Sequence, residues 1–375
     1  MMHIGFDAKR AYHNNTGLGN YSRDLISGLL SLHPSHTYHL YTPELSNNPR
    51  IDVLQKHDNC NIHQPDSWFG KCFKGYWRSV ALEDDLIRDG ISVFHGLSNE
   101  IPRKKTGKVK YVVSIHDLIF LHHPETYRAI DRKIYNRKFR YAALNADKVI
   151  AISKQTKRDL VEFYGVDPDR IRVIYQSCND NFKRAYSAEE KEFIRAKYNL
   201  PEEYLLYVGT IEARKNLGTV VKALQQVPDI PLVVCGRRTP YFGQVEATVN
   251  ELGLEKRVLF YENVDFPDLP GFYQMATLFV YPSIFEGFGI PIIEAMYSKI
   301  PVITSKGGVF PETGGGDSVY VDPNNVEELE TTINELLTDS HRCRRISEKG
   351  WDYVQRFSTA NFVNQTMEVY GEVNG

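Results

Sequence analysis

Cysteine is scarce in this sequence and shows no pairing pattern. The chain has five cysteines in 375 residues, an odd number with no Cys-x-x-Cys pair. Disulfide-framed domains need paired cysteines and structural zinc sites need closely spaced ligands, so the sequence argues against both. We expect a protein of a reducing compartment.

Long apolar runs and a strong charge of either sign are also missing. No stretch is apolar for long enough to span a bilayer, and the first residues lack the charged and apolar regions of a signal peptide. A net charge of -2, with 25% charged and 42% hydrophobic residues, argues against a nucleic-acid binder and against a disordered chain. We therefore expect a globular cytoplasmic protein.

Strand-like segments alternate with segments of helical length and period, which predicts βαβ units and parallel sheets. The length corresponds to about 2.5 average domains, which we interpret as two. The fold class is therefore α/β with two doubly wound sheets, and the polar, aperiodic stretch 176–183 marks the crossing between them. The expected strands form two series: 2–6, 38–41, 92–95, 111–115, 148–152 and 172–174, then 204–208, 232–235, 258–260, 278–281, 302–304 and 319–321.

A glycine-rich turn follows the apolar strand 277–281. Gly287 and Gly289 allow a backbone to approach a ligand closely. Pro291 suits the first position of a helix, whose N-terminal amides attract anions. The pattern predicts an anion-binding turn between a buried strand and a helix.

Two carboxylates flank this turn, Glu286 and Glu294, with seven residues between them. Carboxylates accept hydrogen bonds from vicinal hydroxyls, and backbone amides bind phosphate. The stretch therefore suits a polyhydroxylated ligand that carries phosphate. The spacing alone also fits an ordinary strand, turn and helix with two solvated glutamates.

A second candidate segment leaves the strand 204–208 through Gly209 and reaches Arg214 and Lys215 at a helix start. A planar guanidinium beside an ammonium group can bind a diphosphate. A capped helix with exposed basic residues is the alternative.

In the first half, two strand ends carry candidate ligand contacts, because ligands of doubly wound sheets bind where strands end. The loop after the first strand contains Gly17, Gly19 and Asn20 before a helix, although such loops also form ordinary turns. His116 and Asp117 follow the strand 111–115. A single buried histidine is otherwise more often a core residue.

These segments resemble the retaining GT-B-fold glycosyltransferases with a Glu-x7-Glu signature, known as glycosyltransferase family 4 or group 1. The similarity rests on Glu-Gly-Phe-Gly at 286–289 and on Gly-Thr-Ile-Glu-Ala-Arg-Lys-Asn-Leu at 209–217, which is most similar to the O-antigen mannosyltransferase-like branch. The loop at 16–19 resembles the family's Gly-Gly-x-Gly, with Thr16 in place of the first glycine. The resemblance covers nearly the whole chain.

The resemblance implies a GT-B fold, with two Rossmann-like domains facing across a cleft and a C-terminal helix that crosses back to the N-terminal domain. It assigns 1–176 plus about 357–375 to an acceptor-binding domain and 177–356 to a nucleotide-sugar-binding domain.

The resemblance also implies residue roles. His116 contacts the donor sugar and acts in catalysis with Glu286, Arg214 and Lys215. Asp117 is a candidate for contact with the acceptor or for orienting His116, and Asn20 is an acceptor candidate. The donor-binding set is Gly17, Gly19, Gly209, Val264, Gly287, Phe288, Gly289 and Glu294. None of these segments contains Asp-x-Asp, and cationic side chains can replace a metal ion, so we expect no metal and no cofactor.

The expected reaction is transfer of a hexose, with retention, from a nucleotide sugar to a saccharide or lipid-linked oligosaccharide in surface polysaccharide biosynthesis. Branch resemblance alone favours GDP-mannose as the donor. Two alternatives remain, a sugar-nucleotide 2-epimerase of the same architecture and a non-catalytic sugar-binding scaffold. The basic and aromatic segments 68–78 and 127–141 suit either peripheral contact with the inner face of a membrane or solvated helix faces.

Overall fold

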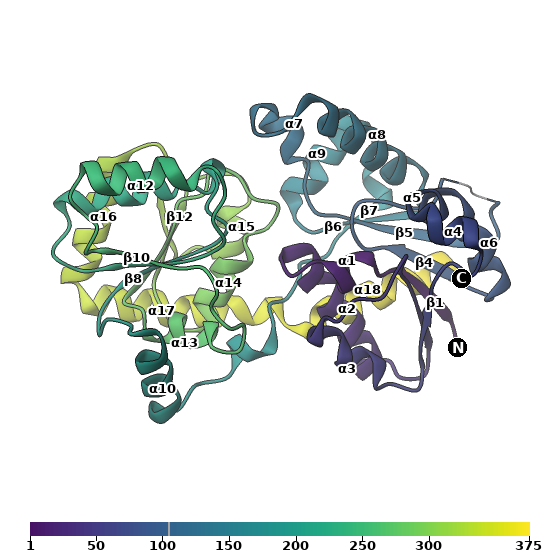
Figure 1. Cartoon of the computed structure of the whole chain (residues 1–375), viewed down its shortest axis with the longest axis horizontal. Coiled ribbons are helices and arrows are strands. Elements are labelled where there is room, and N and C mark those ends of the chain that lie inside the picture. The colour runs from purple at the N-terminus through teal and green to yellow at the C-terminus, as the bar shows by residue number, and fades with distance from the viewer. Residues whose placement is uncertain (104–105) are drawn as a thin grey trace. The chain divides into compact units, whose positions relative to one another are not determined.

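The computed structural model describes residues 1–103 and 106–375. The chain forms two compact units. The N-terminal unit contains Met1–Ser177 and Phe357–Gly375, and the C-terminal unit contains Cys178–Arg356. Each unit is a parallel sheet with helices packed around it (Figure 1).

The sheet of the N-terminal unit has the strand order β3-β2-β1-β4-β5-β6-β7, and all its strand pairs are parallel in the described residues. Its strands are β1 His3–Asp7, β2 Thr37–Tyr41, β3 Cys60–His63, β4 Val93–Gly96, β5 Lys110–Ile115, β6 Lys148–Ala151 and β7 Ile171–Val173. Its α-helices are α1 Lys9–His13, α2 Gly17–Leu32, α3 Asp52–Gln55, α4 Trp68–Cys72, α5 Lys74–Tyr76, α6 Leu82–Arg88, α7 Ile119–His122, α8 Ala129–Asn145, α9 Lys154–Tyr164 and α18 Thr359–Asn374.

The sheet of the C-terminal unit has the order β10-β9-β8-β11-β12-β13, again parallel throughout. Its strands are β8 Leu205–Val208, β9 Leu232–Cys235, β10 Val258–Tyr261, β11 Leu278–Tyr281, β12 Val302–Ser305 and β13 Val319–Val321. Its α-helices are α10 Ala188–Tyr198, α11 Leu217–Ala223, α12 Phe242–Glu251, α13 Leu269–Met275, α14 Ile290–Tyr297, α15 Phe310–Gly314, α16 Val326–Thr338 and α17 Ser340–Val354.

The strand order places a topological switch point in each sheet. In the N-terminal unit β1 lies between β2 and β4, and in the C-terminal unit β8 lies between β9 and β11. The loops that leave neighbouring strands diverge there to opposite faces of the sheet, so a ligand can bind beyond the strand ends. The switch points therefore lie at β1/β4 and at β8/β11.

The prediction of two doubly wound parallel sheets is confirmed, and each predicted strand lies within one residue of its expected bounds. The prediction missed one strand, β3. Its sequence, Cys-Asn-Ile-His, has a single large aliphatic residue, and Ile62 is partly exposed because β3 is an edge strand. An edge strand buries little side-chain surface, so its hydrophobic pattern is weak.

Within the described residues, no helix combines the length and apolarity that a bilayer crossing requires. In the same part of the chain, no group of three or more His, Cys, Asp or Glu side chains is arranged to hold a metal ion. The sequence contains one Asp-x-Asp, Asp167–Pro168–Asp169, and it forms a turn before β7, in which the Asp169 amide donates to Asp167 Oδ1 at 3.0 Å.

Candidate functional site

In the C-terminal unit, the loops that follow β8 and β11 are joined at the switch point. The amide of Ile284 donates to the carbonyl of Arg214 at 2.8 Å, and Asn216 Nδ2 donates to the carbonyl of Pro282 at 3.1 Å. Segments about 70 residues apart in sequence therefore form one surface, which holds all the charged candidates of this unit except Glu294.

Glu286 is the centre of this surface. Its Oε1 accepts hydrogen bonds from Tyr281 Oη at 2.7 Å and Ser283 Oγ at 3.0 Å. The same oxygen lies 3.1 Å from Arg214 Nη1 and 3.7 Å from Lys215 Nζ. Burial acts to raise the pKa of this carboxyl, but the two cations and the hydroxyl donors outweigh it and lower the pKa to about 2. The carboxylate is therefore ionised at any working pH.

The two cations are held in place from several sides. Arg214 also donates to the carbonyl of Phe285 and to Glu212 Oε1, the latter at 2.5 Å. Lys215 Nζ donates to Tyr281 Oη at 3.0 Å. A Cβ at Gly209 would lie 3.2 Å from Lys215 Nζ, so glycine leaves the space that the ammonium group occupies. The predicted pair of cations is thus a fixed cluster rather than two solvated side chains.

The glycine-rich turn leads directly into α14. Gly289 has φ of 98° and caps the helix, a conformation that side chains rarely adopt. Gly287 and Phe288 are buried, and the carbonyl of Phe288 accepts a hydrogen bond from Thr313 Oγ1 at 2.5 Å. The helix begins at Ile290, so Pro291 is its second residue and not its first as predicted. The other free amides at the start of α14 still point toward the glycine-rich turn. Proline at the first or the second helical position removes only one N–H group, and that group has no acceptor within the helix.

Glu294 lies in α14 and is buried, 8% exposed. Tyr273 Oη donates to Glu294 Oε2 at 2.7 Å, which fixes the carboxylate against α13. Val264 lies farther along the sheet, half-buried in the loop after β10. The structure therefore separates the two glutamates: Glu286 pairs with the cations, and Glu294 is bound by a buried tyrosine.

In the N-terminal unit, the loop between α1 and α2 is organised by Asn14. Its Oδ1 accepts from the amides of Thr16 at 2.9 Å and Gly19 at 3.1 Å. A Cβ at Gly19 would lie 1.7 Å from the carbonyl oxygen of Asn14, so the fold itself requires this glycine. A Cβ at Gly17 would meet nothing within 4 Å. Gly17 is the first residue of α2, and the space beside its Cα is unfilled, so a ligand can approach the helix N-terminus there.

Arg23 holds the same loop in place through hydrogen bonds from its guanidinium group. Its Nη1 donates to the carbonyls of Ala11 at 2.7 Å and Asn14 at 2.8 Å, and its Nη2 donates to Asn20 Oδ1 at 2.6 Å. The side-chain oxygen of Asn20, an acceptor candidate in the sequence, is therefore used within the loop. No local sequence pattern marks Arg23, because its partners are mostly backbone carbonyls.

His116 follows β5 and is 5% exposed. Its Nε2 lies 2.8 Å from the carbonyl of Leu97, which can only accept, so Nε2 carries the proton and Nδ1 is the acceptor. Burial lowers the pKa of His116 to about 4. The ring is therefore neutral at pH 7. The carbonyl of Leu97, rather than Asp117, is the ring partner that the structure shows, and Asp117 accepts from the amide of Ile119 at 3.1 Å.

A buried hydrogen-bonded chain lies beneath His116. Tyr21 Oη is 2.6 Å from Ser114 Oγ, which is 2.8 Å from His95 Nε2, and His95 Nδ1 is 2.6 Å from Tyr370 Oη in α18. The ring of Tyr21 also packs edge-on against His116 at 4.6 Å. This chain ties α2 and the C-terminal helix to the sheet directly under the candidate histidine. It was missed in the sequence because its members are distant from one another along the chain.

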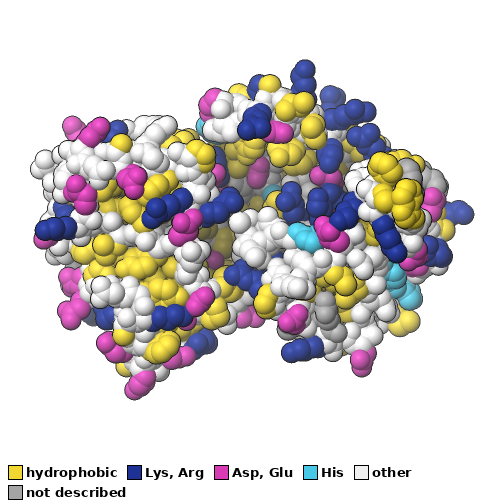
Figure 2. All heavy atoms as spheres, in the orientation of Figure 1, with side chains coloured by type: hydrophobic (Ala, Val, Ile, Leu, Met, Phe, Trp, Pro, Cys, Tyr) yellow, Lys and Arg dark blue, Asp and Glu magenta, His cyan; other side chains and the backbone are white. Residues whose placement is uncertain are grey.

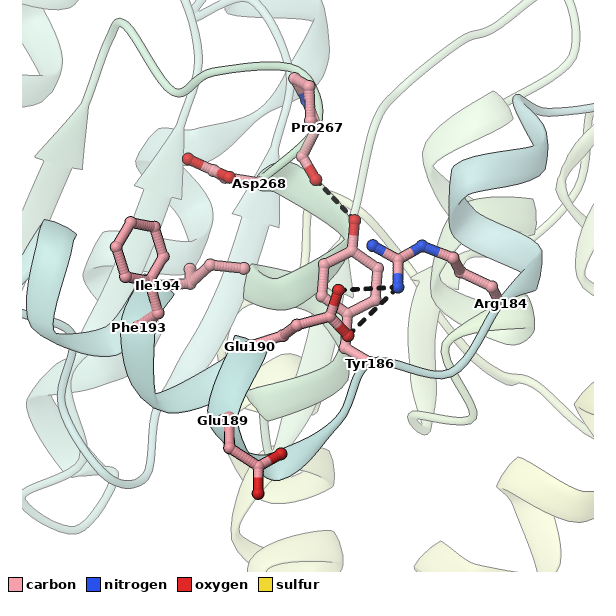
Figure 3. Close-up of a pocket in the computed structure, with 8 residues that line it drawn as sticks. All are labelled: Arg184, Tyr186, Glu189, Glu190, Phe193, Ile194, Pro267 and Asp268. Carbon is pink, nitrogen blue, oxygen red and sulfur yellow. Dashed lines mark hydrogen bonds and ion pairs between the residues drawn. The ribbon is translucent and has the colours of Figure 1, made fainter.

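A separate pocket of the C-terminal unit, with a volume of about 360 Å³, lies between α10 and the start of α13 (Figure 3). Tyr186 Oη donates to the carbonyl of Pro267 across it, and Arg184 stacks 3.9 Å over the ring of Tyr186. None of the predicted site residues lines it. Its lining residues are Arg184, Tyr186, Glu189, Glu190, Phe193, Ile194, Pro267 and Asp268.

Two family models match the chain. The model described as Glycosyl transferases group 1 matches residues 190–352, and the model described as Glycosyltransferase Family 4 matches residues 15–181. Together they include every predicted site residue of both units.

Curated relatives and solved structures agree with these models. The chain is 30% identical to O-antigen chain mannosyltransferase B of Escherichia coli over 285 residues, 74% of each chain, and 31% identical to RfbU, an O-antigen chain mannosyltransferase of Salmonella typhimurium, over 66% of each. A glycosyltransferase of Rickettsia africae aligns with a TM-score of 0.77 at 20% identity, over 99% of this chain and 98% of that one. Anabaena HepE in complex with UDP and glucose aligns with a TM-score of 0.77 at 19% identity, over 99% and 100%. The predicted GT-B fold is confirmed, and the chain belongs to the family of group 1 and family 4 glycosyltransferases.

Proposed function

We propose that this glycosyltransferase moves mannose, with retention and without a metal ion, from GDP-mannose to a saccharide or lipid-linked oligosaccharide of a surface polysaccharide. The observation that carries the proposal is the cluster of Glu286, Arg214 and Lys215 at the β8/β11 switch point, followed by the N-terminus of α14. Mannose as the donor sugar rests on the O-antigen chain mannosyltransferases among the relatives.

The proposed mechanism follows from where charge develops. When the glycosidic bond of the donor breaks, negative charge collects on the leaving diphosphate. Arg214, Lys215 and the first-turn amides of α14 lie together and stabilise that charge without having to reorganise. Arg214 and Lys215 also supply the positive charge that a divalent metal supplies in other transferases.

The sugar ring becomes electron-poor in the same step. Glu286 stays ionised and accepts hydrogen bonds from hydroxyls of the sugar, so its interaction with the ring strengthens in the transition state. His116 presents a neutral Nδ1 acceptor to a donor-sugar hydroxyl, since its Nε2–H donates a hydrogen bond to the carbonyl of Leu97. Glu294, held by a hydrogen bond from Tyr273, accepts hydrogen bonds from the ribose hydroxyls.

The proposed location is the cytoplasm, with peripheral contact to a membrane that carries the acceptor. Two segments of the N-terminal unit support contact: Trp68, Phe73 and Tyr76 in and around α4 and α5, and Ile130 and Ile134 in α8, are large exposed apolar residues beside lysines and arginines. Such surfaces bind the interface of anionic membranes. Sedimentation with vesicles of neutral and of anionic lipid tests this contact, and equal absence of binding to both contradicts it.

One experiment separates the proposal from its two alternatives. The purified protein is first screened by thermal shift against nucleotide sugars, since a ligand at 100 times its Kd stabilises by about 2.7 kcal/mol. It is then incubated with labelled GDP-mannose with and without a mannoside acceptor, and the anomeric configuration of the product is read by NMR. We expect an α-linked product that requires the acceptor. An epimer formed without acceptor, or binding without turnover, contradicts the proposal.

A further inference from the structure

Tyr281 lies at the centre of the charged cluster in the C-terminal unit. It is the last residue of β11 and is completely buried. Its hydroxyl donates to Glu286 Oε1 at 2.7 Å and accepts from Lys215 Nζ at 3.0 Å. Burial, together with the charge of Glu286, raises the pKa of Tyr281 well above its usual range, so the hydroxyl keeps its proton. The hydroxyl therefore bonds to both charged groups, to one as donor and to the other as acceptor.

The ammonium group of Lys215 stops short of direct contact with the Glu286 carboxylate. Its Nζ lies 3.7 Å from Glu286 Oε1, whereas a hydrogen bond between such charged groups is about 2.7–2.9 Å long. The two side chains are only 15% and 12% exposed, so water screens their attraction little. Direct contact would strengthen this attraction, and the Tyr281 hydroxyl stands where that contact would form.

The partners of the Glu286 carboxylate all gather on one of its two oxygens. Oε1 accepts from Tyr281 Oη and from Ser283 Oγ, and it lies 3.1 Å from Arg214 Nη1. In the described part of the chain, no hydrogen bond or ion pair of this carboxylate involves Oε2. A carboxylate oxygen offers about two lone pairs, so three donors already fill Oε1. Removing the Tyr281 hydroxyl would open a place on Oε1 beside the ammonium group of Lys215.

Lys215 keeps donors for a ligand in this arrangement. Among the residues that the structure describes, Tyr281 Oη is the one hydrogen-bond acceptor of its ammonium group, which has three N–H donors. Figure 2 shows Lys and Arg side chains of the C-terminal unit interspersed with Asp and Glu side chains on the face in view. That face offers an anion no broad positive surface, so the placement of single cations decides where an anion binds.

We propose that Tyr281 is a positioning residue, whose hydroxyl occupies the contact position between Lys215 and Glu286 and so keeps the ammonium group available to the diphosphate of the donor. This inference rests on the proposed function, which assigns Lys215 to that diphosphate. Without the hydroxyl, Lys215 and Glu286 form a direct ion pair. The ammonium group then withdraws from the diphosphate, and the charge of the carboxylate is spent on Lys215 instead of on the sugar.

The variant Tyr281→Phe tests this role, because it removes the hydroxyl and keeps the ring that packs against Tyr207 and Phe279. We expect ligand-free crystal structures to show Lys215 Nζ about 2.8 Å from Glu286 Oε1 in the variant, in place of the 3.7 Å of the parent protein. Calorimetry with GDP, the product of the proposed donor, should give an affinity about tenfold lower or more, as for a lost charge-assisted hydrogen bond.

The matched control is Tyr207→Phe. Tyr207 is also completely buried, and its hydroxyl donates to the backbone carbonyl of Lys215 at 3.1 Å rather than standing between the two charges. This change removes one tyrosine hydroxyl from the same lysine and should alter neither the distance nor the affinity for GDP.

Two double variants separate positioning from a general loss of packing. In Lys215→Ala the ammonium group is absent, so adding Tyr281→Phe should lower the affinity for GDP no further. In Glu286→Gln no carboxylate attracts the ammonium group, so adding Tyr281→Phe should again leave the affinity unchanged. Equal losses of affinity in all backgrounds overturn the inference. An unchanged distance between Lys215 and Glu286 in Tyr281→Phe, or a water molecule in the place of the hydroxyl, overturns it as well.

The same measurements distinguish failure of the inference from failure of the proposed function. A loss of GDP affinity in Lys215→Ala without one in Tyr281→Phe refutes the inference only. A parent protein that does not bind GDP refutes the proposed donor, and the crystal structures then decide the inference. GDP affinity that is unchanged in Lys215→Ala refutes the assignment of Lys215 to the diphosphate, and the role of Tyr281 falls with it.

Discussion

Replacing Glu286 by glutamine tests the central cluster most directly. Glutamine keeps the shape and an oxygen that can accept from Tyr281 and Ser283, but it removes the charge that faces Arg214 and Lys215. The carboxyl pKa falls from 4.5 to about 2 in the folded protein, which corresponds to about 3 kcal/mol of favourable interaction of the ionised form.

The pH dependence of that contribution has a definite sign. A carboxyl whose pKa is lowered by folding stabilises the protein fully above its unfolded pKa, here near 4.5, and loses the contribution as the pH falls toward 2. We expect Glu286→Gln to lower the free energy of unfolding of the C-terminal unit by up to about 3 kcal/mol at pH 7. The difference should fall to about half or less near pH 3. Urea denaturation at the two pH values, followed by a probe in that unit, measures it.

The kinetic consequence is more specific than a loss of activity. Without the opposing carboxylate, Arg214 and Lys215 carry more net positive charge toward a bound diphosphate. We therefore expect a lower inhibition constant for the nucleoside diphosphate product and an unchanged or lower donor KM. Turnover should fall by about 100-fold or more, because the charge that stabilises the electron-poor sugar is lost.

The matched control for Glu286→Gln is Glu212→Gln. Glu212 also pairs with Arg214, at 2.5 Å, but its side chain is 38% exposed, so solvent screens its charge. This variant should keep both turnover and product inhibition close to those of the parent protein. The reasoning is wrong if the two variants behave alike, or if Glu286→Gln retains normal turnover and an unchanged inhibition constant.

The remaining predictions concern five other residues. Arg214→Ala should cost about 2–4 kcal/mol in kcat/KM, while EDTA should leave the parent rate unchanged; inactivation by EDTA that a divalent metal reverses would contradict the assignment. Gly17→Ala should keep the parent melting temperature but raise donor KM, whereas Gly19→Ala should destabilise the N-terminal unit, since only Gly19 is crowded. Glu294→Gln should raise donor KM more than it lowers kcat in steady-state assays. Since burial lowers the His116 pKa to about 4, the pH profile of kcat/KM should show no titration of a histidine between pH 5 and 7. A titration in that range that disappears when His116 is replaced contradicts a neutral ring.

The sequence predicted the parts of the site that have a local pattern. Apolar strands precede both Gly287 and Gly289 and the neighbouring pair Arg214 and Lys215. The end of a strand in a doubly wound sheet is a position that can be located from the sequence. It also predicted the glycine loop, although it could not distinguish Gly19, which the fold requires, from an unconfined glycine.

The parts that were missed depend on backbone partners or on distant segments. Leu97 orients His116 through its carbonyl oxygen, which any residue provides, so no side chain marks the position. Tyr370 reaches His95 from 275 residues away, a pairing that only the tertiary fold creates. Strand β3 was missed for a related reason, because it is held mainly by backbone pairing with β2.

The charge states of Glu286 and His116 have different causes, and this difference bears on the proposed mechanism. In the C-terminal unit Arg214 and Lys215 help lower the pKa of Glu286 to about 2, so its carboxylate is ionised despite its burial. In the N-terminal unit burial keeps His116 neutral, and no carboxylate is among the groups that shift its pKa. A protonated ring would oppose an electron-poor sugar, whereas a neutral Nδ1 acceptor does not. In the proposed mechanism Arg214, Lys215 and α14 stabilise the leaving diphosphate. Combining Arg214→Ala with Lys215→Ala should therefore cost less than the sum of the single losses, because the two cations act on one charge.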